Sequence, residues 1–501
     1  MKVKLVGANL ELEQVDRALR EPTYRPHLSP EPIAAAYARI SRSEKTVEQL
    51  RQDARENVEK ARRSNRNIVF EMGHSSIAEH ATFNFDMEGI SRLAIEAVEH
   101  SRLASYTERS QRYVLIGSDM VVPDEVAHDE SLRTRFVEAF EAMSRGYRSL
   151  VDGLLEHQLR EAGGAAIDKE RRREIDTATR EDARYLLPLA TAGQLGMTLN
   201  ARSLENMVRR LKGHPLAEVR RVGGLLEEEA LAVTPSLIRH TDPWRWVPPD
   251  VSRMPGTFGA GSVPTRGRAS LLHVTPAPAS LLAAGACFEA TGRFPVEAGN
   301  PGDDSSALPD GGVDGGPRSG DAPDRYESER GFGPLVQTLA DAWFSGAGVH
   351  APAPRSFELV DFLFELTCSA ACFGQLKRHR MATLLVAPYD ADLAPVVPPS
   401  VVGAGLTDLF LACLETVRPL RDALRRDGNP AAEYLFANAH CRKMLFKTNL
   451  RELVHVSRLR LDHHAQWEIR ELVSDMCALA SSRLPEVERW LCGKDVFGAG
   501  G

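Results

Sequence analysis

The chain repeats itself, and this constrains its fold more than any other feature. Ala183-Arg184-Tyr185-Leu186 is followed by Asn200-Ala201-Arg202-Ser203-Leu204, and Ala432-Glu433-Tyr434-Leu435 is followed by Asn449-Leu450-Arg451-Glu452-Leu453. The interval from the tyrosine to the asparagine is the same in both copies. Earlier segments match in the same order, so we infer an internal duplication. Such a chain is expected to fold as two similar domains.

A second matched pair lies earlier in each copy, at residues 100–113 and 375–390. The later segment keeps the basic cluster Arg378-His379-Arg380 and loses the polar loop after it. The earlier segment keeps a polar loop, Glu108-Arg109-Ser110-Gln111-Arg112-Tyr113, and loses most of the basic cluster. Each copy is therefore incomplete where the other is whole, which predicts one working site assembled from unlike halves.

Bulk properties predict a soluble globular protein of the cytoplasm. The 501 residues are 43% hydrophobic and 26% charged, and the formal charge of −7 argues against a dominant nucleic-acid-binding surface. No apolar run approaches the roughly 20 residues that span a bilayer, and the first residues lack a signal peptide's apolar region. The 7 cysteines show no metal-binding spacing, so we expect a reducing compartment and no metal.

Composition divides the chain into domains. We expect a first domain at residues 1–247, a linker at 248–267 and a second domain at 268–501, because residues 269–276 resemble the opening strand at 3–7 and an alanine-rich helix follows each. Residues 294–331 are rich in Gly, Pro, Asp and Ser, which predicts a disordered insertion.

Hydrophobic periodicity predicts an α+β fold. Strands are expected at 81–87 and 357–366, where apolar residues alternate or cluster. Helices are expected at 48–63, 91–103 and 368–381. Two long helices are expected to close the copies, at 195–211 and 443–461, each followed by another helix.

Several motifs together resemble the flavin-dependent thymidylate synthases. The first copy contributes residues 73–80, 83–85, 89–92 and the polar loop, and the second contributes Arg378-His379-Arg380, residues 449–453 and residues 458–470. The resemblance implies two tandem domains, each a small mixed or antiparallel sheet packed with long helices. It also implies FAD as cofactor, dUMP as substrate, and methylenetetrahydrofolate and NADPH as co-substrates.

The departures from the family pattern fall on complementary positions. The first copy has His100 and Ser101 where the signature has Arg and His, and Ala97 where it has Gln. The second copy has Gln375 there, but Val386, Pro388 and Asp390 replace the Glu, Ser and Arg of the polar loop, and Glu433 stands where the first copy has Arg184. In the family each site is built from several subunits of a homotetramer, so we expect a homodimer of this chain to form a pseudo-tetramer.

The resemblance assigns a role to each candidate residue. Arg460 is the expected catalytic residue, since its cation would stabilise charge developing on the pyrimidine ring. Arginine forks and a serine hydroxyl suit a nucleotide phosphate, and the expected dUMP-binding residues are Glu108, Ser110, Gln111, Arg112, Arg184, Gln375 and Arg378. The expected FAD-binding residues are His74, Ser76, Glu79, Glu108, Asn200, Arg202, Asn206, Arg378, His379, Arg380, Asn449 and Arg451.

Two other interpretations stay open at this stage. A related enzyme would use FAD and a folate to modify C5 of another pyrimidine nucleotide. A catalytically inactive nucleotide- or flavin-binding protein would explain the degraded motif in each copy. The sparing of one complete set of complementary residues argues against random decay. Asp462-His463-His464 suggests a metal site, but helix capping or a flavin contact is the favoured explanation.

Overall fold

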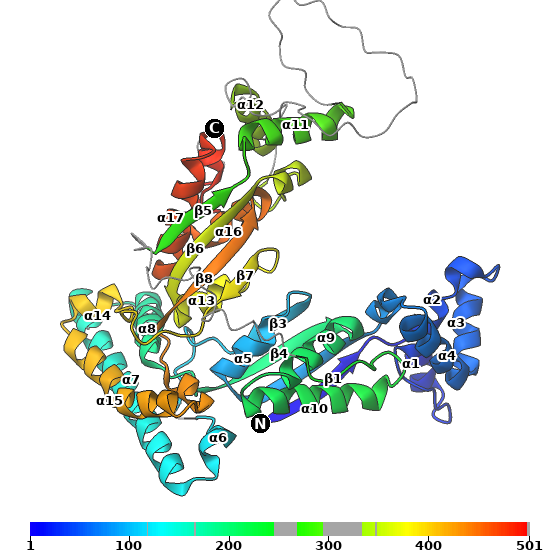
Figure 1. Cartoon of the computed structure of the whole chain (residues 1–501), viewed down its shortest axis with the longest axis horizontal. Coiled ribbons are helices and arrows are strands. Elements are labelled where there is room, and N and C mark those ends of the chain that lie inside the picture. Colours follow the sequence, from blue (N-terminus) through cyan, green and yellow to red (C-terminus); the bar gives the residue numbers. More distant parts are fainter. Residues whose placement is uncertain (118, 165–166, 245–267, 294–332, 346–347, 498–501) are drawn as a thin grey trace, which may run out of the picture. The chain divides into compact units, whose positions relative to one another are not determined.

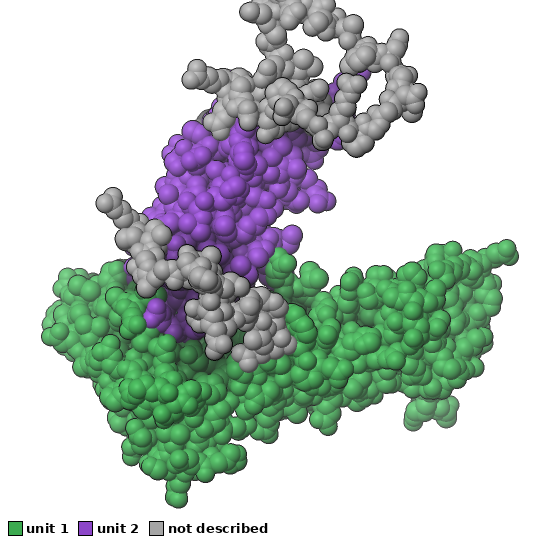
Figure 2. Space-filling view, in the orientation of Figure 1, with its two compact units in different colours: residues 1–258, 369–371, 391–440 green, residues 259–368, 372–390, 441–501 purple. Residues whose placement is uncertain are grey.

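The computed structural model describes every residue except 118, 165–166, 245–267, 294–332, 346–347 and 498–501. Contacts group the chain into two compact units (Figure 2). Unit 1 holds Met1–Phe258, Ser369–Ala371 and Ala391–His440, and unit 2 holds Gly259–Cys368, Cys372–Asp390 and Cys441–Gly501. Unit 1 therefore contains part of the second copy. The domain boundaries expected from the sequence follow the order of the repeats along the chain, and they stay a prediction. The expected linker and the expected insertion lie outside the described residues.

Unit 1 is built on a four-stranded sheet of order β1-β2-β4-β3, with antiparallel neighbours (Figure 1). Phe83, Phe85 and Met87 point to the same face of β2 and are fully buried, as alternation in a half-buried strand requires. Helices α9 and α10 pack together, and both contact the sheet. The bounds are β1(Lys2–Ala8), β2(Thr82–Ser91), α5(Arg92–Glu99), β3(Ala104–Glu108), β4(Ala192–Asn200), α9(Ala201–Lys212) and α10(Ala217–Val233).

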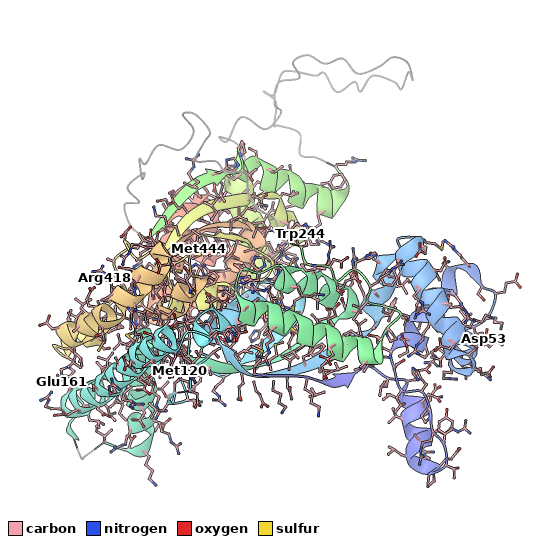
Figure 3. The ribbon with its side chains drawn as sticks, turned by 60° about the horizontal axis from the view of Figure 1, so that its bottom comes forward. Asp53, Met120, Glu161, Trp244, Arg418 and Met444 are labelled. Atoms are coloured by element: carbon pink, nitrogen blue, oxygen red, sulfur yellow. The ribbon has the colours of Figure 1, made fainter. Side chains whose placement is uncertain are left out.

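Two further groups of helices complete unit 1. One contains helices of both copies, and its long helices α7 and α15 run side by side, with Glu161 at the end of α7 and Arg418 on α15 (Figures 1 and 3). Its bounds are α6(Asp124–Ala127), α7(Glu130–Glu161), α8(Lys169–Ala183), η5(Arg184–Leu186), α14(Pro399–Gly403), α15(Thr407–Arg426) and η9(Pro430–Leu435). The other group follows β1 and holds α1(Leu12–Arg20), α2(Glu31–Tyr37), η1(Ile40–Arg42), α3(Val47–Glu56), α4(Val58–Arg66), η2(Asn67–Glu71) and η3(Ser75–His80).

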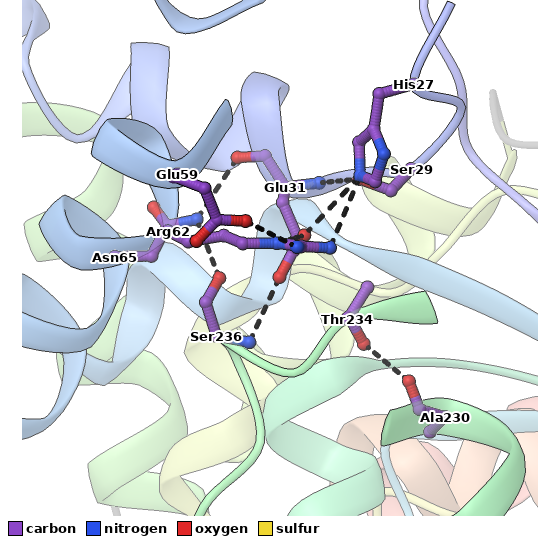
Figure 4. A network of polar contacts seen from close by, with 9 residues as sticks. All are labelled: His27, Ser29, Glu31, Glu59, Arg62, Asn65, Ala230, Thr234 and Ser236. Carbon is purple, nitrogen blue, oxygen red and sulfur yellow. Dashed lines mark hydrogen bonds and ion pairs between the residues drawn. The ribbon is translucent and has the colours of Figure 1, made fainter. Parts of the chain in front are cut away.

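A buried carboxylate anchors this second group (Figure 4). Glu31 is fully buried, and its carboxylate accepts hydrogen bonds from Arg62 Nε at 2.7 Å and from the main-chain N–H of Ser236 at 3.0 Å. Asn65 donates to the Glu31 carbonyl at 3.1 Å and to the Ser236 hydroxyl at 3.2 Å. Because Ser236 follows α10, the network ties the beginning of unit 1 to the end of the first copy.

Unit 2 repeats the first sheet with the order β5-β6-β8-β7. The same strand order in both sheets confirms that the chain is a duplication of one α+β fold. Cys368 and Cys372 lie in the core of this unit, as small buried side chains. The bounds are β5(Ala269–Val274), α11(Pro278–Thr291), α12(Gly333–Ser345), η8(Arg355–Leu359), β6(Asp361–Ser369), α13(Ala370–Leu376), β7(Thr383–Val386), β8(Cys441–Asn449), α16(Leu450–Arg460), α17(Trp467–Ser481) and η10(Pro485–Trp490).

Within unit 1, the two copies pair with each other around a local twofold axis. Ala190 N–H donates to Tyr434 O at 3.0 Å, and the equivalent Ala439 N–H donates to Tyr185 O at 2.8 Å. Leu189 N–H donates to Phe436 O at 2.8 Å, and the equivalent Asn438 N–H donates to Leu187 O at 2.9 Å. Residues 185–190 and 434–439 thus form a self-complementary contact of the kind that joins identical subunits.

Several elements differ from the sequence prediction. The long helices expected at 195–211 and 443–461 each begin as a strand, β4 or β8, because residues 195, 197 and 199 are buried and their neighbours are not. The helix expected at 48–63 is two helices, since Asn57 leaves helical dihedrals and caps α4. The helix expected at 368–381 is only α13, and Arg378 lies in the turns after it. The expected strand at 357–366 begins later, after η8. The opening strands and alanine-rich helices of both copies are confirmed.

No helix in the described part of the chain combines the length and the apolar character that a membrane span needs.

Candidate functional site

The polar loop of unit 1 follows β3, and three of its predicted functional side chains, Glu108, Ser110 and Arg112, contact neighbouring residues. Glu108 ends the strand and pairs with the buried Arg92, the first residue of α5. The Ser110 hydroxyl accepts a hydrogen bond from the main-chain N–H of Arg112 at 3.1 Å, which closes a tight turn. This turn places the Arg112 side chain beside Glu181 of α8, with which it forms an ion pair.

Arg184 lies behind the same loop and is buried, with 7% of its surface exposed. Its Nε donates to the carbonyl of Glu181 at 3.1 Å, but its buried Nη2 has no hydrogen-bond partner within the described residues. Burial lowers the pKa of Arg184; Glu181 opposes this shift, and the nearby Arg112 and Arg92 add to it. A buried guanidinium donor without a partner is costly, so this position is prepared for an anion.

A residue of the second copy also reaches the polar loop. The side-chain amide of Asn438 donates to Gln111 Oε1 at 2.9 Å and to the Arg184 carbonyl at 2.9 Å. Both contacts lie within unit 1. The structure therefore brings together four of the predicted dUMP-binding residues, Ser110, Gln111, Arg112 and Arg184, and adds Asn438, which the sequence did not single out.

The corresponding loop of the second copy is closed by packing. Tyr389, which matches Gln111, is buried, and the Arg442 guanidinium lies 4.0 Å from the centre of its ring. Pro388 and Asp390 replace the serine and the second arginine. An aromatic core contact and a carboxylate thus occupy the positions that an anion site would need.

In unit 2, Arg460 is held at the end of α16 by two hydrogen bonds. Its Nε donates to His379 Nε2 at 2.9 Å, and its Nη2 donates to the Gln375 carbonyl at 3.0 Å. His379 must be neutral to accept this bond, with its proton on Nδ1, which lies 3.6 Å from a Glu452 carboxylate oxygen. Burial holds the pKa of His379 well below its ordinary value, and Arg460 and His455 act in the same direction.

Gln375 and His379 are buried, whereas Arg378 and Arg380 are exposed beyond the end of α13. The Gln375 amide donates to the fully buried Gln466 at 3.4 Å. His379 therefore serves to hold Arg460, and its contact with a flavin stays a prediction.

The first copy contains an equivalent of Arg460 that sequence comparison did not find. Arg210 donates through Nη1 to the Ala97 carbonyl at 2.8 Å and through Nη2 to the Ser101 hydroxyl at 3.1 Å. Ala97 and Ser101 match Gln375 and His379, so the two arginines occupy equivalent places. Burial lowers the pKa of Arg210 to about 10. Shifting the C-terminal motif of the first copy by one residue would have revealed this match.

Four of the predicted flavin residues line two cavities, one in each unit. His74 and Ser76 lie at a cavity of about 480 Å³ in unit 1, whose other walls include Arg39, Arg42 and Lys45. Gly73, just before His74, has φ +76, a conformation that favours glycine. Asn449 and Arg451 lie at a cavity of about 560 Å³ in unit 2, with His455, Arg458 and Lys494. Each wall holds more basic than acidic side chains, and with these volumes the cavities suit a phosphate-bearing cofactor.

Two pairs of predicted flavin residues have structural partners. Asn200 and Asn449 cap α9 and α16, because their side chains accept hydrogen bonds from the N–H groups of Ser203 and Glu452 at 2.8 and 2.9 Å. Arg202 pairs with Glu79 at 2.5 Å, and its equivalent Arg451 pairs with Glu358 at 2.6 Å. Asn206 is exposed on α9. These contacts repeat between the copies and stabilise the helix starts.

Asp462, His463 and His464 come within 4.8 Å of one another, but local contacts explain them. The Asp462 carboxylate accepts from the His464 N–H at 2.9 Å, and the exposed His463 ring lies 2.9 Å from Asp495. The three residues lie in the turn between α16 and α17, whose capping residues are Leu461 and Gln466, so the structure does not bear out a capping role for them.

Comparison with known proteins decides the family. The family model described as thymidylate synthase complementing protein matches residues 26–236 and 344–486, which together are more than half of the chain. This chain belongs to that family. The matched regions fall on both copies and leave out the linker and the insertion, as a tandem duplication requires.

Two related synthases each match about half of the chain or less. A flavin-dependent thymidylate synthase of Clostridium tetani is 31% identical over 245 residues, which are 48% of this chain and 90% of that protein. One of Geobacter sulfurreducens is 37% identical over 139 residues, 27% of this chain and 50% of that protein. A solved flavin-dependent thymidylate synthase of Helicobacter pylori, complexed with FAD and dUMP, is 17% identical with a TM-score of 0.27, over 48% of this chain and all of that chain.

Proposed function

We propose that this protein is a flavin-dependent thymidylate synthase that converts dUMP to dTMP, using methylenetetrahydrofolate, FAD and NADPH. The observation that supports it best is the division of the site between the copies. The first copy keeps the polar loop and the Arg184 Nη2 donor, for which the described residues offer no hydrogen-bond partner, and the second keeps Arg460 held against Gln375 and His379. Neither copy holds a complete set.

The phosphate of dUMP is assigned to the polar loop. Arg112 and the buried Arg184 present cationic donors, and a phosphate would satisfy the Arg184 Nη2 that lacks a partner within the described residues. A charge-assisted hydrogen bond of this kind is worth about 1.5–3 kcal/mol. Glu181 already pairs with Arg112, so the phosphate would share that guanidinium.

The pyrimidine is assigned to the unit 2 residues. Arg460 would stabilise negative charge as C5 of the ring becomes nucleophilic, and Gln375 would meet the uracil edge. Two hydrogen bonds fix the Arg460 guanidinium in advance, so little reorganisation is needed at the moment of reaction. Bound flavin would supply the hydride that reduces the transferred carbon.

The two cavities are the flavin sites of this proposal. His74 and Ser76 in unit 1, and Asn449 and Arg451 in unit 2, stand beside basic side chains that would meet a pyrophosphate. Arg458 also lines the unit 2 cavity, and its guanidinium packs 4.0 Å from the centre of the Phe497 ring. The remaining predicted flavin residues, Glu79, Glu108, Asn200, Arg202, Asn206, Arg378, His379 and Arg380, are kept as proposals.

We propose one active site per chain and a homodimer as the working assembly. The local twofold contact between residues 185–190 and 434–439 resembles a subunit contact placed inside one chain. Two chains would then supply four repeats. The closed loop at Tyr389 excludes the reciprocal site from nucleotide binding.

Tritium release from C5-labelled dUMP tests the proposed reaction. Purified protein with FAD, NADPH and methylenetetrahydrofolate should release tritium and form dTMP. Release with uridine 5′-monophosphate but not with dUMP would assign a different acceptor. Binding of flavin and dUMP without release would indicate an inactive binding protein.

A further inference from the structure

The side chain of Asn438 is almost completely buried, with 1% of its surface exposed, at the local twofold contact between the copies. Its Nδ2 lies 2.9 Å from the Arg184 carbonyl and 2.9 Å from Gln111 Oε1. Its Oδ1 is buried and has no hydrogen-bond partner within the described residues. Leaving one acceptor unpaired is unfavourable, so the two donated hydrogen bonds must offset that loss.

These contacts determine the orientation of both amides. A main-chain carbonyl can only accept, so the NH2 group of Asn438 must face Arg184. The same NH2 group faces Gln111, which must present its oxygen, because two amino groups would oppose each other. The Nε2 of Gln111 is therefore turned away from Asn438, and none of the hydrogen bonds found among the described residues involves it. It remains available as a donor at the polar loop.

The equivalent position in the first copy is Leu189, which cannot make these hydrogen bonds. Gln111 is likewise matched by Tyr389 in the second copy. The pair of amides is thus present on one side of the local twofold contact only, the side that keeps Ser110, Arg112 and Arg184. This asymmetry links Asn438 to the intact loop rather than to the packing of the twofold contact, which the main-chain pairs maintain on both sides.

We propose that Asn438 is a positioning residue for nucleotide binding, supplied by the second copy to the loop of the first. It holds Gln111 with Nε2 directed toward an oxygen of a bound nucleoside monophosphate. This inference rests on the proposed function, since it assigns the nucleotide to the polar loop. It adds a residue outside the duplicated motifs to the site.

Calorimetric titration of the flavin-loaded full chain with dUMP tests the inference through a double-mutant cycle. Asn438→Leu installs the residue of the other copy, and Gln111→Ala removes the amide that Asn438 orients. Each should weaken dUMP binding about five- to tenfold, as expected for one or two hydrogen bonds. The double variant should bind no more weakly than either single variant, because Asn438 acts through Gln111.

Asn438→Asp keeps the size of the side chain and replaces Asn438→Leu if the latter lowers the thermal midpoint strongly. The carboxylate would draw Gln111 Nε2 inward and present Oε1 to the nucleotide, so binding should weaken in the same range. Asn429→Ala is the matched control: it removes hydrogen bonds to Ala431 and Glu125 in the same unit and should leave dUMP binding unchanged.

Two outcomes overturn the inference while the proposed function stands: unchanged dUMP affinity in both Asn438 variants, or single effects that multiply in the double variant. A wild-type chain that binds flavin but no dUMP would contradict the proposed function itself and therefore also the inference.

Discussion

The Nε of Arg460 lies 2.9 Å from Nε2 of His379 and donates a hydrogen bond to that neutral ring. In the first copy, Arg210 makes the corresponding contact with the Ser101 hydroxyl. Both copies therefore keep an arginine with equivalent contacts, but the residues around the two arginines differ. Only the unit 2 arginine stands beside a glutamine, Gln375, so we assign the chemistry to Arg460.

Arg460→Ala should lower turnover at least about a hundredfold, because a preorganised cation next to the developing charge is lost. Arg210→Ala is the matched variant and should leave most of the turnover, since its neighbours lack the signature residues. Steady-state dTMP formation measures both. Equal losses in the two variants would contradict the division of labour between the copies.

Arg184→Ala should raise the KM for dUMP about 10- to 100-fold, because a buried charge-assisted hydrogen bond to the phosphate disappears. Glu433→Ala changes the equivalent position of the second copy and should alter KM little. The two variants are compared at saturating folate and NADPH. A large effect of Glu433→Ala would show that the reciprocal site also takes part.

Unit 2 should lose stability as the pH falls below about 6.5. The pKa of His379 is depressed in the folded state, so the unfolded chain takes up a proton that the folded chain resists. The contribution of His379 to stability is fully present above the pKa of this group in the unfolded chain. It is lost as the pH falls toward the pKa in the folded chain, by at most about 1.4 kcal/mol per pH unit.

His379→Gln tests this assignment, since its amide oxygen can still accept from Arg460 and it does not titrate. Urea unfolding midpoints at pH 7.5 and 5.5 should differ less in this variant than in the wild-type chain. The same pH dependence in both proteins would assign the effect to other groups.

Glu31→Ala should lower the free energy of unfolding of unit 1 by about 3–5 kcal/mol, because Arg62 and the Ser236 N–H lose a buried partner. Glu174→Ala removes an exposed pair with Arg171 and should change stability little. Thermal denaturation, monitored by circular dichroism, distinguishes the two variants. A loss of similar size in both variants would contradict the importance of the buried network.

The sequence predicted the duplication, the α+β class and the opening strands, because these depend on local patterns. It misassigned β4 and β8, since their alternation runs directly into an amphipathic helix at Asn200 and Asn449. The split at Asn57 and the early end of α13 depend on side-chain capping and tertiary packing that periodicity does not report.

Sequence motifs predicted some residues of the candidate site. The residues that long-range packing brings to the site could not be predicted. Ser110, Arg112, Arg184 and Arg460 follow from motif positions. Asn438 contacts the loop only because the two copies pair around a twofold axis, and nothing in its own neighbourhood signals that contact.

The number of nucleotides bound per chain tests the central claim most directly. Calorimetric titration of the flavin-loaded protein with dUMP should saturate at one per chain, because the second copy has the buried Tyr389 where the polar loop of the first copy has Gln111. Saturation at two per chain would show that the loop at Tyr389 also binds nucleotide, and would contradict a single site pooled from two incomplete copies.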